Sequence, residues 1–153
     1  MVKILFVCHG NICRSPMAEF VMKDLVKKAG FEGEFLIESA ATSTEEIGND
    51  MYPPAKEKLR REGVPFTRRG ARQITAADYD KYDYLVGMDD ENLYYMNRRW
   101  SNDPDNKISL LLEFAGQVRE VADPWYTGNF DRTFLDVTQG CEALLNKIKS
   151  VKK

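Results

Sequence analysis

Short apolar runs alternate with amphipathic helix patterns along this chain of 153 residues, and this alternation is the feature that most constrains its fold. The first run, VKILFV (2–7), is rich in β-branched residues, as is typical of a buried parallel strand. Further strand patterns lie at 34–40, 83–88 and 107–111. We therefore expect an α/β fold, with an open parallel sheet of about four strands and helices on both faces.

The segments between these strands carry helix signals. Ser15 is the predicted N-cap of the first helix, because Pro16 follows at the first helical position, and Gly30 can end this helix. The other predicted helices cover 53–63, 91–99 and a stretch that begins at about Asp131. The sequence contains no repeat, low-complexity segment or domain linker, so 1–153 is expected to form one domain.

Composition argues against several classes of protein. With a net charge of -2, overall charge indicates neither a nucleic-acid partner nor an anionic membrane. The first apolar run is too short for a signal peptide or a membrane span. Three cysteines without an export signal indicate reduced thiols in the cytoplasm. His9 is the one histidine and no Cys/His cluster is present, so no zinc site is expected.

The segment CHGNICRS (8–15) joins the first predicted strand to the first predicted helix. Such a junction binds anions, because free N–H groups and the positive end of the helix dipole face the ligand there. Gly10 permits a tight turn that can curl successive N–H groups into a nest. Arg14 offers a planar fork that matches two phosphate oxygens.

The same surroundings stabilise a thiolate, since a helix N-terminus and a nearby cation both favour negative charge on sulfur. Cys8 is therefore predicted to be a nucleophile at neutral pH, seated under a bound phosphate. The alternative is a buried cysteine at the end of a strand, with Arg14 on the surface.

The stretch VCHGNICRSPMAEF (7–20) resembles the phosphate-binding loop and first helix of the low-molecular-weight protein tyrosine phosphatases. Other stretches are similar to the same family: ESAATS (38–43), ARQI (71–74), MDDENL (88–93), and DPW followed by Tyr126. The resemblance covers essentially the whole chain, which implies that 1–153 is a single phosphatase domain of this family.

The resemblance implies a division of roles around the loop. Cys8 would attack phosphorus and form a phosphocysteine, while Arg14 would hold the phosphoryl oxygens. Ser15 would hydrogen-bond the sulfur, and Asn11 would hold the loop in shape through a network that includes Ser39. Simpler alternatives stay open: Ser15 as a helix cap, Asn11 as a residue that tolerates positive φ, and Ser39 as a strand-end hydroxyl.

The motif DPWY (123–126) would supply a second reacting group. The resemblance implies that Asp123 is the general acid, and chemistry agrees because a departing phenolate gains from a positioned proton. Its carboxylate could then take a proton from the attacking water. Pro124 restricts the conformation of Asp123, although Asp-Pro is also a common turn pair. Only the family fold brings residue 123 near residue 8.

Five residues are expected to shape the pocket. Ile12 stands where the resemblance implies threonine in arginine phosphatases, so it favours an aromatic ring and hence phosphotyrosine; alternatively, it only anchors the loop. Trp125 and Tyr126 would add aromatic surface. Glu45 falls where many members carry an aromatic wall, and its charge would disfavour acidic substrate flanks. His9 is predicted to be a rim residue, because this mechanism needs no base to activate the adjacent cysteine.

Four further residues have assignments that the sequence leaves open. Arg69 falls where the resemblance implies a histidine of the loop-supporting network in eukaryotic members, so the sequence departs from the family pattern at this point of the network. Asp89 could brace the loop arginine or simply cap the following helix. By resemblance, Cys13 would trap the oxidised nucleophile as a disulfide; otherwise it is a small buried hydrophobe. Cys141 lies on the apolar stripe of the last helix and is expected in the core.

Taken together, these features predict a cytoplasmic phosphotyrosine phosphatase that needs no metal or other cofactor, because Arg14, loop amides and the helix dipole can stabilise the phosphoryl group. Its expected partners are phosphotyrosine-containing proteins, with a cognate tyrosine kinase as a further candidate. A thiol arsenate reductase on the same fold would need another cysteine pair, whereas only Cys141 follows the loop. A non-catalytic phosphate-binding module would need neither Cys8 nor Asp123.

Overall fold

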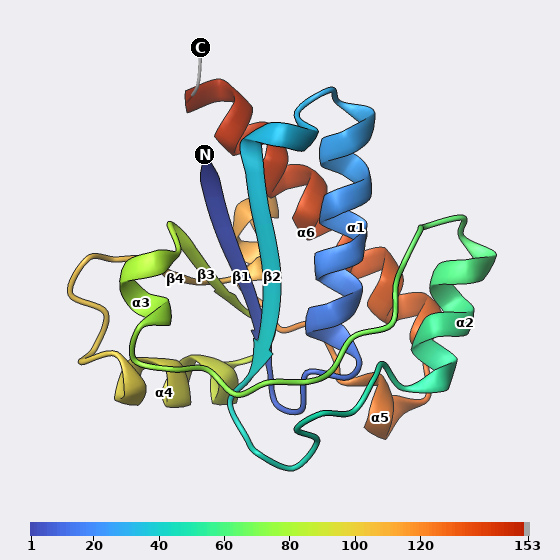
Figure 1. Ribbon diagram of the computed structural model, residues 1–153, viewed down its shortest axis with the longest axis horizontal. Helices are drawn as coiled ribbons and strands as arrows, with labels where there is room; N and C mark the ends of the chain where they lie inside the picture. Colours follow the sequence, from blue (N-terminus) through green and yellow to red (C-terminus); the bar gives the residue numbers. More distant parts are fainter. Residues whose placement is uncertain (152–153) are drawn as a thin grey trace.

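The computed structural model of the protein describes residues 1–151 and contains a four-stranded parallel sheet with the order β2-β1-β3-β4 (Figure 1). The strands are β1 (Val2–Cys8), β2 (Phe35–Ala41), β3 (Tyr84–Gly87) and β4 (Ile108–Leu110). The α-helices are α1 (Arg14–Lys28), α2 (Pro53–Arg61), α3 (Asp78–Lys81), α4 (Asp90–Arg99), α5 (Pro124–Thr127) and α6 (Phe130–Val151). Two 3-10 helices, η1 (Glu32–Glu34) and η2 (Leu111–Ala115), adjoin β2 and β4.

The side chains of β1 alternate between two separate cores. Ile4 and Phe6 join the core formed with α1 and α6, whereas Leu5 and Val7 join a second core formed with residues of α3 and α4. All four are fully buried. Successive strand residues face opposite sides of a sheet. A strand that is apolar throughout must therefore be covered by other elements on both faces of the sheet. The predicted α/β fold with helices on both faces is confirmed (Figure 1).

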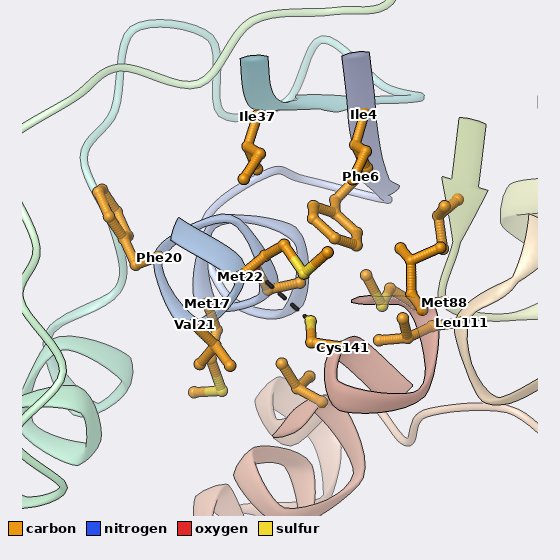
Figure 2. Close-up of a cluster of buried hydrophobic side chains, with 14 of the residues drawn as sticks. Ile4, Phe6, Met17, Phe20, Val21, Met22, Ile37, Met88, Leu111 and Cys141 are labelled. Carbon is orange, nitrogen blue, oxygen red and sulfur yellow. Dashed lines mark hydrogen bonds between the residues drawn. The ribbon is translucent and has the colours of Figure 1, made fainter. Parts of the chain in front are cut away.

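The core between the sheet, α1 and α6 is tightly packed (Figure 2). Cys141 of α6 is fully buried there, with its Sγ 3.7 Å from the carbonyl oxygen of Ala18. Gly140 allows α6 to approach η2, because a Cβ at this position would lie only 2.4 Å from Cγ of Leu111. That distance is well inside van der Waals contact, so any side chain at Gly140 would force the core to shift.

The start of α1 differs from the prediction. Pro16 is the third residue of this helix rather than the first, and no side chain caps the helix. The N–H of Met17 donates to the carbonyl of Cys13 at 3.1 Å, so the helical hydrogen bonds begin two residues earlier than expected. Ser15 is therefore not an N-cap; its hydroxyl instead contacts the sulfur of Cys8.

The other predicted elements are present with slightly shifted ends. The elements α3, α5, η1 and η2 were not predicted, since each has five residues or fewer and a single turn shows little periodicity. Among the helices in residues 1–151, none has both the length and the apolar character that a membrane span requires.

Several distant segments meet at the C-terminal edge of the sheet, where ligands bind in open α/β folds. The first strand ends there at Cys8, and Asp89 follows β3. Val121 donates its N–H to the carbonyl of Met88 at 2.8 Å, which holds the chain before α5 beside the end of β3. Parallel bridges tie the chain at and after the end of β2 to 71–73. The fold thus assembles one site from four parts of the sequence.

Candidate active site

Cys8 is buried at the end of β1, and its sulfur is held by the loop that follows. The backbone N–H of Asn11 donates to Sγ at 3.3 Å, and the hydroxyl of Ser15 lies 3.0 Å from the same atom. Hydrogen-bond donors around a sulfur at the N-terminus of a helix stabilise a thiolate. The geometry is therefore suited to a nucleophilic cysteine.

A cleft of about 140 Å³ contains this cysteine. It is lined by Cys8, His9, Gly10, Ile12, Cys13, Arg14, Glu45, Glu46, Asp123, Trp125 and Tyr126. The cleft brings loop 8–15 together with the DPWY motif, which the sequence alone could not place beside it. A larger cavity of about 640 Å³ lies between α1, β2 and 65–72, but it includes no cysteine and no residue of loop 8–15. The smaller cleft is therefore the candidate active site.

A chain of side-chain hydrogen bonds supports the loop from behind. Asn11 has a φ of 59°, in the left-handed region that asparagine tolerates better than most residues. Its Nδ2 donates to the hydroxyl of Ser15 at 2.7 Å and to that of Ser39 at 3.0 Å. Ser39 in turn donates to Oε1 of Glu19 at 2.6 Å. These bonds join α1 and β2 to the loop that follows Cys8.

Arg69 extends this network from a third segment. Its Nη2 donates to Oδ1 of Asn11, and its Nη1 donates to the carbonyl of Asn49 at 3.3 Å. The N–H of Arg72 donates to the same Asn11 oxygen at 3.3 Å. Burial lowers the pKa of Arg69 in spite of attraction to Glu19 and other anions. An arginine thus contacts the loop at the position where the resemblance implied a histidine in eukaryotic members.

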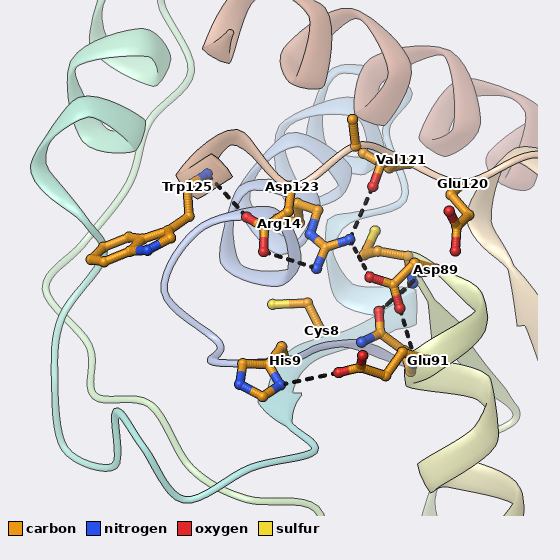
Figure 3. Close-up of polar contacts among 12 residues, drawn as sticks. Cys8, His9, Arg14, Asp89, Glu91, Glu120, Val121, Asp123 and Trp125 are labelled. Atoms are coloured by element: carbon orange, nitrogen blue, oxygen red, sulfur yellow. Dashed lines mark hydrogen bonds and ion pairs between the residues drawn. The ribbon is translucent and has the colours of Figure 1, made fainter. Parts of the chain in front are cut away.

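The guanidinium of Arg14 is only 2% exposed and is fixed by three oxygens (Figure 3). Its Nη1 donates to Oδ2 of Asp89 at 2.8 Å and to the carbonyl of Val121 at 2.9 Å, while its Nη2 lies 3.4 Å from Oδ2 of Asp123. Burial by itself lowers the pKa of Arg14, but attraction to Cys8 and the two carboxylates outweighs it, so this pKa is raised. The cleft therefore contains a permanently charged, immobilised cation.

Asp89 performs both tasks that the sequence left open. One of its oxygens contacts Arg14, and the other accepts a hydrogen bond from the N–H of Asn92 at 2.8 Å, which caps α4. The side chain of Asn92 closes the capping box by bonding back to the N–H of Asp89. The brace on the arginine is thus fixed by the start of a helix.

Asp123 also combines a structural contact with access to the cleft. Its Oδ1 accepts from the N–H of Trp125 at 3.0 Å, which caps α5, and its Oδ2 faces Arg14. The side chain keeps 24% of its surface exposed, so a ligand in the cleft can reach it. The cap that Asp123 forms for α5 is compatible with a reacting carboxyl group in this geometry.

One part of the cleft wall, formed by Ile12, Trp125 and Tyr126, is apolar and aromatic. Trp125 and Tyr126 are exposed, and the ring of Tyr52 supports Trp125 with 4.7 Å between their centroids. Ile12 is mostly buried and packs with Cys13, so it anchors the loop while it lines the cleft. A flat ring entering the cleft would therefore meet apolar atoms on its way to the cysteine.

His9 lies at the rim and contacts carboxylates. Its Nε2 is 2.5 Å from Oε2 of Glu45, and its Nδ1 is 3.6 Å from Oε1 of Glu91. The Nε2 contact gives the imidazole a hydrogen-bond partner other than Cys8, whereas Nδ1 makes no hydrogen bond within residues 1–151.

All three cysteines are free thiols. Burial and the negative charge of Cys8 raise the pKa of Cys13, and burial raises the pKa of Cys141. Cys13 lines the same cleft as Cys8, whereas Cys141 lies in the core. Within residues 1–151, no group of His, Cys, Asp and Glu side chains is arranged to hold a metal ion.

Sequence reasoning missed several residues of the site. Glu19 could have been found, because it lies four residues after Ser15 and hence on the same face of α1. The rim residues Glu46 and Glu91, the aromatic support Tyr52 and the carbonyl of Val121 had no distinguishing local pattern. Their roles depend on contacts between segments that are distant in the sequence.

Fold and site together define an α/β protein whose first strand ends at a cysteine, followed by a loop that leads into the first helix and lines a cleft. Residues 3–153 match the family model described as low molecular weight phosphotyrosine protein phosphatase. The chain belongs to this family, whose members are phosphoric monoester hydrolases, and the resemblance seen in the sequence is confirmed.

Individual relatives agree with this assignment. The low molecular weight protein-tyrosine-phosphatase YfkJ of Bacillus subtilis is 40% identical over 100% of this chain and 99% of its own length. Its crystal structure superposes with a TM-score of 0.96, covering 100% of this chain and 98% of that one. The human low molecular weight phosphotyrosine protein phosphatase is 38% identical over 94% of both chains. The Drosophila arginine phosphatase DARP is 30% identical, with a TM-score of 0.87 over 97% of this chain and 98% of that one.

Proposed function

We propose that this protein hydrolyses phosphotyrosine through a phosphocysteine intermediate on Cys8. One observation carries the proposal: a single cleft contains the sulfur of Cys8, the fixed guanidinium of Arg14 and the accessible carboxylate of Asp123. These are the nucleophile, the phosphoryl-binding cation and the acid that a two-step phosphoryl transfer requires.

In the first step, Sγ of Cys8 attacks phosphorus as the bond to the tyrosine oxygen breaks, and Asp123 gives its proton to the departing phenolate. Arg14 and the N–H groups of the loop hold the equatorial oxygens, where negative charge is stabilised. In the second step, the carboxylate of Asp123 takes a proton from water, which attacks phosphorus and releases phosphate. The hydroxyl of Ser15, 3.0 Å from Sγ, stabilises the thiolate as it departs.

The supporting residues act on the geometry of the loop. Asn11 joins the loop to Ser39 and Arg69, so its backbone N–H stays directed at the sulfur despite the positive φ. If Gly10 carried a Cβ, the atoms nearest to it would belong to the side chains of Glu46 and Ile12, which are flexible. A preformed ring of donors stabilises developing charge without reorganisation during the reaction.

The walls favour an aryl phosphate over a guanidino phosphate. Ile12, Trp125 and Tyr126 present apolar surface to the ring of a bound tyrosine. We infer that the natural substrates are phosphotyrosine-containing proteins of the cytoplasm, and that a cognate tyrosine kinase works in opposition to this enzyme. An arginine phosphatase has the same fold, so substrate choice has to be measured.

The direct test compares peptides that carry phosphotyrosine, phosphoarginine or phosphoserine, each with a metal chelator present. We expect phosphotyrosine to be hydrolysed fastest. Acid quenching during turnover should trap phosphate on Cys8, and Cys8→Ser should abolish turnover while phosphate still binds. Cys141→Ala, which changes a thiol in the core, should still form the phosphocysteine. Preference for phosphoarginine, or substantial turnover by Cys8→Ser, would overturn the proposal.

A further inference from the structure

Carboxylates gather around the entrance to the catalytic cleft. Glu45 and Glu46 line it from the loop after β2. Glu91 approaches from α4, where its Oε1 lies 3.6 Å from Nδ1 of His9. Figure 3 shows His9 and Glu91 directed toward each other next to Cys8. Two elements that are far apart in the sequence thus place three acidic side chains, which we call the acidic rim, around one entrance.

Little positive charge offsets the acidic rim. The side chains of Glu45 and Glu91 are 67% and 64% exposed and share His9 as their partner. Glu46 accepts from the neutral amide of Asn49 at 2.6 Å. Even a protonated His9 would offset only one of these three carboxylates.

The charged side chains at the base of the cleft do not offset the negative charge at its entrance. Among residues 1–151, Arg14 is the single lysine or arginine that lines the cleft, and it already contacts Asp89 and Asp123. The phosphoryl group is therefore received by a cation at the base, whereas the residues that flank it in a protein meet exposed negative charge.

We propose that the acidic rim of Glu45, Glu46 and Glu91 selects phosphotyrosines that have lysine or arginine close by in the sequence. The inference rests on the proposed function and adds to it the class of sequence that the enzyme prefers. Basic side chains beside the phosphotyrosine gain attraction at the rim, and acidic ones are repelled. Steering by such a patch also raises the association rate and weakens as salt is added.

The size of the effect follows from the exposure of these groups. Each exposed ion pair contributes modestly, and several together should favour a basic peptide over an acidic one by about 3- to 30-fold in kcat/KM. The preference should be largest at about 0.01 M salt and nearly absent at about 1 M, because the Debye length falls from roughly 30 Å to roughly 3 Å.

The experiment uses two phosphotyrosine peptides of equal length, one with lysine and one with glutamate on both sides of the phosphotyrosine. The readout is the ratio of their kcat/KM values, in which any change common to both substrates cancels. The variant Glu45→Gln/Glu46→Gln/Glu91→Gln should bring the ratio close to one. Glu32→Gln makes the same kind of substitution once, at an exposed residue of η1 at the opposite edge of the sheet, and should leave the ratio unchanged.

Each outcome discriminates. Equal cleavage of both peptides, or faster cleavage of the acidic one, would overturn the rim proposal while phosphotyrosine hydrolysis stands. A basic preference that survives in the triple variant or at high salt would also overturn it, because the selection would then lie elsewhere. If neither peptide is cleaved, the proposed function itself fails and the rim proposal fails with it.

Discussion

Arg69 donates a hydrogen bond from its Nη2 to Oδ1 of Asn11, the residue whose backbone N–H points at the sulfur of Cys8. Asn11 can hold its φ of 59° because its side chain is bonded on both ends, to Arg69 through the oxygen and to Ser15 and Ser39 through the nitrogen. A cation outside the cleft thereby helps to shape the donors inside it.

The first prediction concerns this contact. Arg69→Met should lower kcat by about 10- to 100-fold, the range expected for loss of one hydrogen bond to a charged group. Arg69→His, which restores a donor of the type that the resemblance implies in eukaryotic members, should recover part of the loss. Arg68→Met, at the exposed neighbouring arginine, serves as the control and should leave kcat unchanged. Wild-type kcat in Arg69→Met would show that the loop holds its shape without this contact.

The second prediction concerns Asp123 and the leaving group. Tyrosine leaves poorly as a phenolate, because its pKa is about 10, so Asp123→Asn should slow phosphotyrosine hydrolysis by roughly 10²- to 10⁴-fold. The loss should shrink as the leaving phenol becomes more acidic. Rates for a series of aryl phosphates should therefore depend steeply on leaving-group pKa in the variant and weakly in the wild type.

Equal slopes in the two proteins would contradict this role. Asp123 would then be only the cap of α5 that its contact with Trp125 already makes it. Glu120→Gln, which changes an exposed carboxylate that accepts from the N–H of Asp90, is a suitable control and should keep the wild-type slope.

The third prediction concerns the two cysteines of the cleft. Peroxide should oxidise Cys8 to a sulfenic acid, and the Cys13 thiol should then attack that sulfur, forming a disulfide and releasing water. A thiol reductant would restore activity. Cys13→Ser should oxidise further, to sulfinic acid, and recover less. Mass spectrometry of peroxide-treated protein checks the linkage, and equal recovery in both proteins would leave Cys13 as a packing residue.

The surroundings of each cysteine should also decide which unoxidised thiol reacts first with an alkylating reagent. Burial and the charge of Cys8 raise the pKa of Cys13, and burial raises that of Cys141, so both stay protonated near neutral pH. Iodoacetamide at about pH 7 should therefore label Cys8 first, because the thiolate is the reactive form. Preferential labelling of Cys13 would contradict the assignment of the nucleophile.

The fourth prediction concerns stability alone. Gly140→Ala should lower the free energy of unfolding by about 1–3 kcal/mol, the usual cost of overpacking, because the new methyl group would meet Leu111 at 2.4 Å. In an open helix the same change would be stabilising. Gly33→Ala in η1 is the matched control, since no atom lies within 4 Å of its added Cβ. Denaturant unfolding measures both, and a stabilised Gly140→Ala would show that α6 can move away from η2.

Local patterns in the sequence were sufficient for the sheet, the main helices and the loop at the end of β1. Apolar runs that are buried on both sides can be recognised without knowing their neighbours, and the Cys-to-Arg loop can be placed because a strand pattern precedes it and a helix pattern follows it. The same local reasoning was wrong about Ser15, because a proline near a helix start resembles an N1 position even when the helix begins earlier.

The sequence by itself therefore determined the class of fold and the place of Cys8, the proposed nucleophile, between the first strand and the first helix, since both depend on residues that are adjacent along the chain. Only the tertiary structure decided which distant groups surround the loop of Cys8. Asp123 and Val121 contact Arg14, Arg69 contacts Asn11, and the acidic rim lies at the entrance of the cleft. The physical reason is that hydrogen bonds and charge interactions act over a few ångströms of space. Spacing along the chain does not report such distances between segments that the fold brings together.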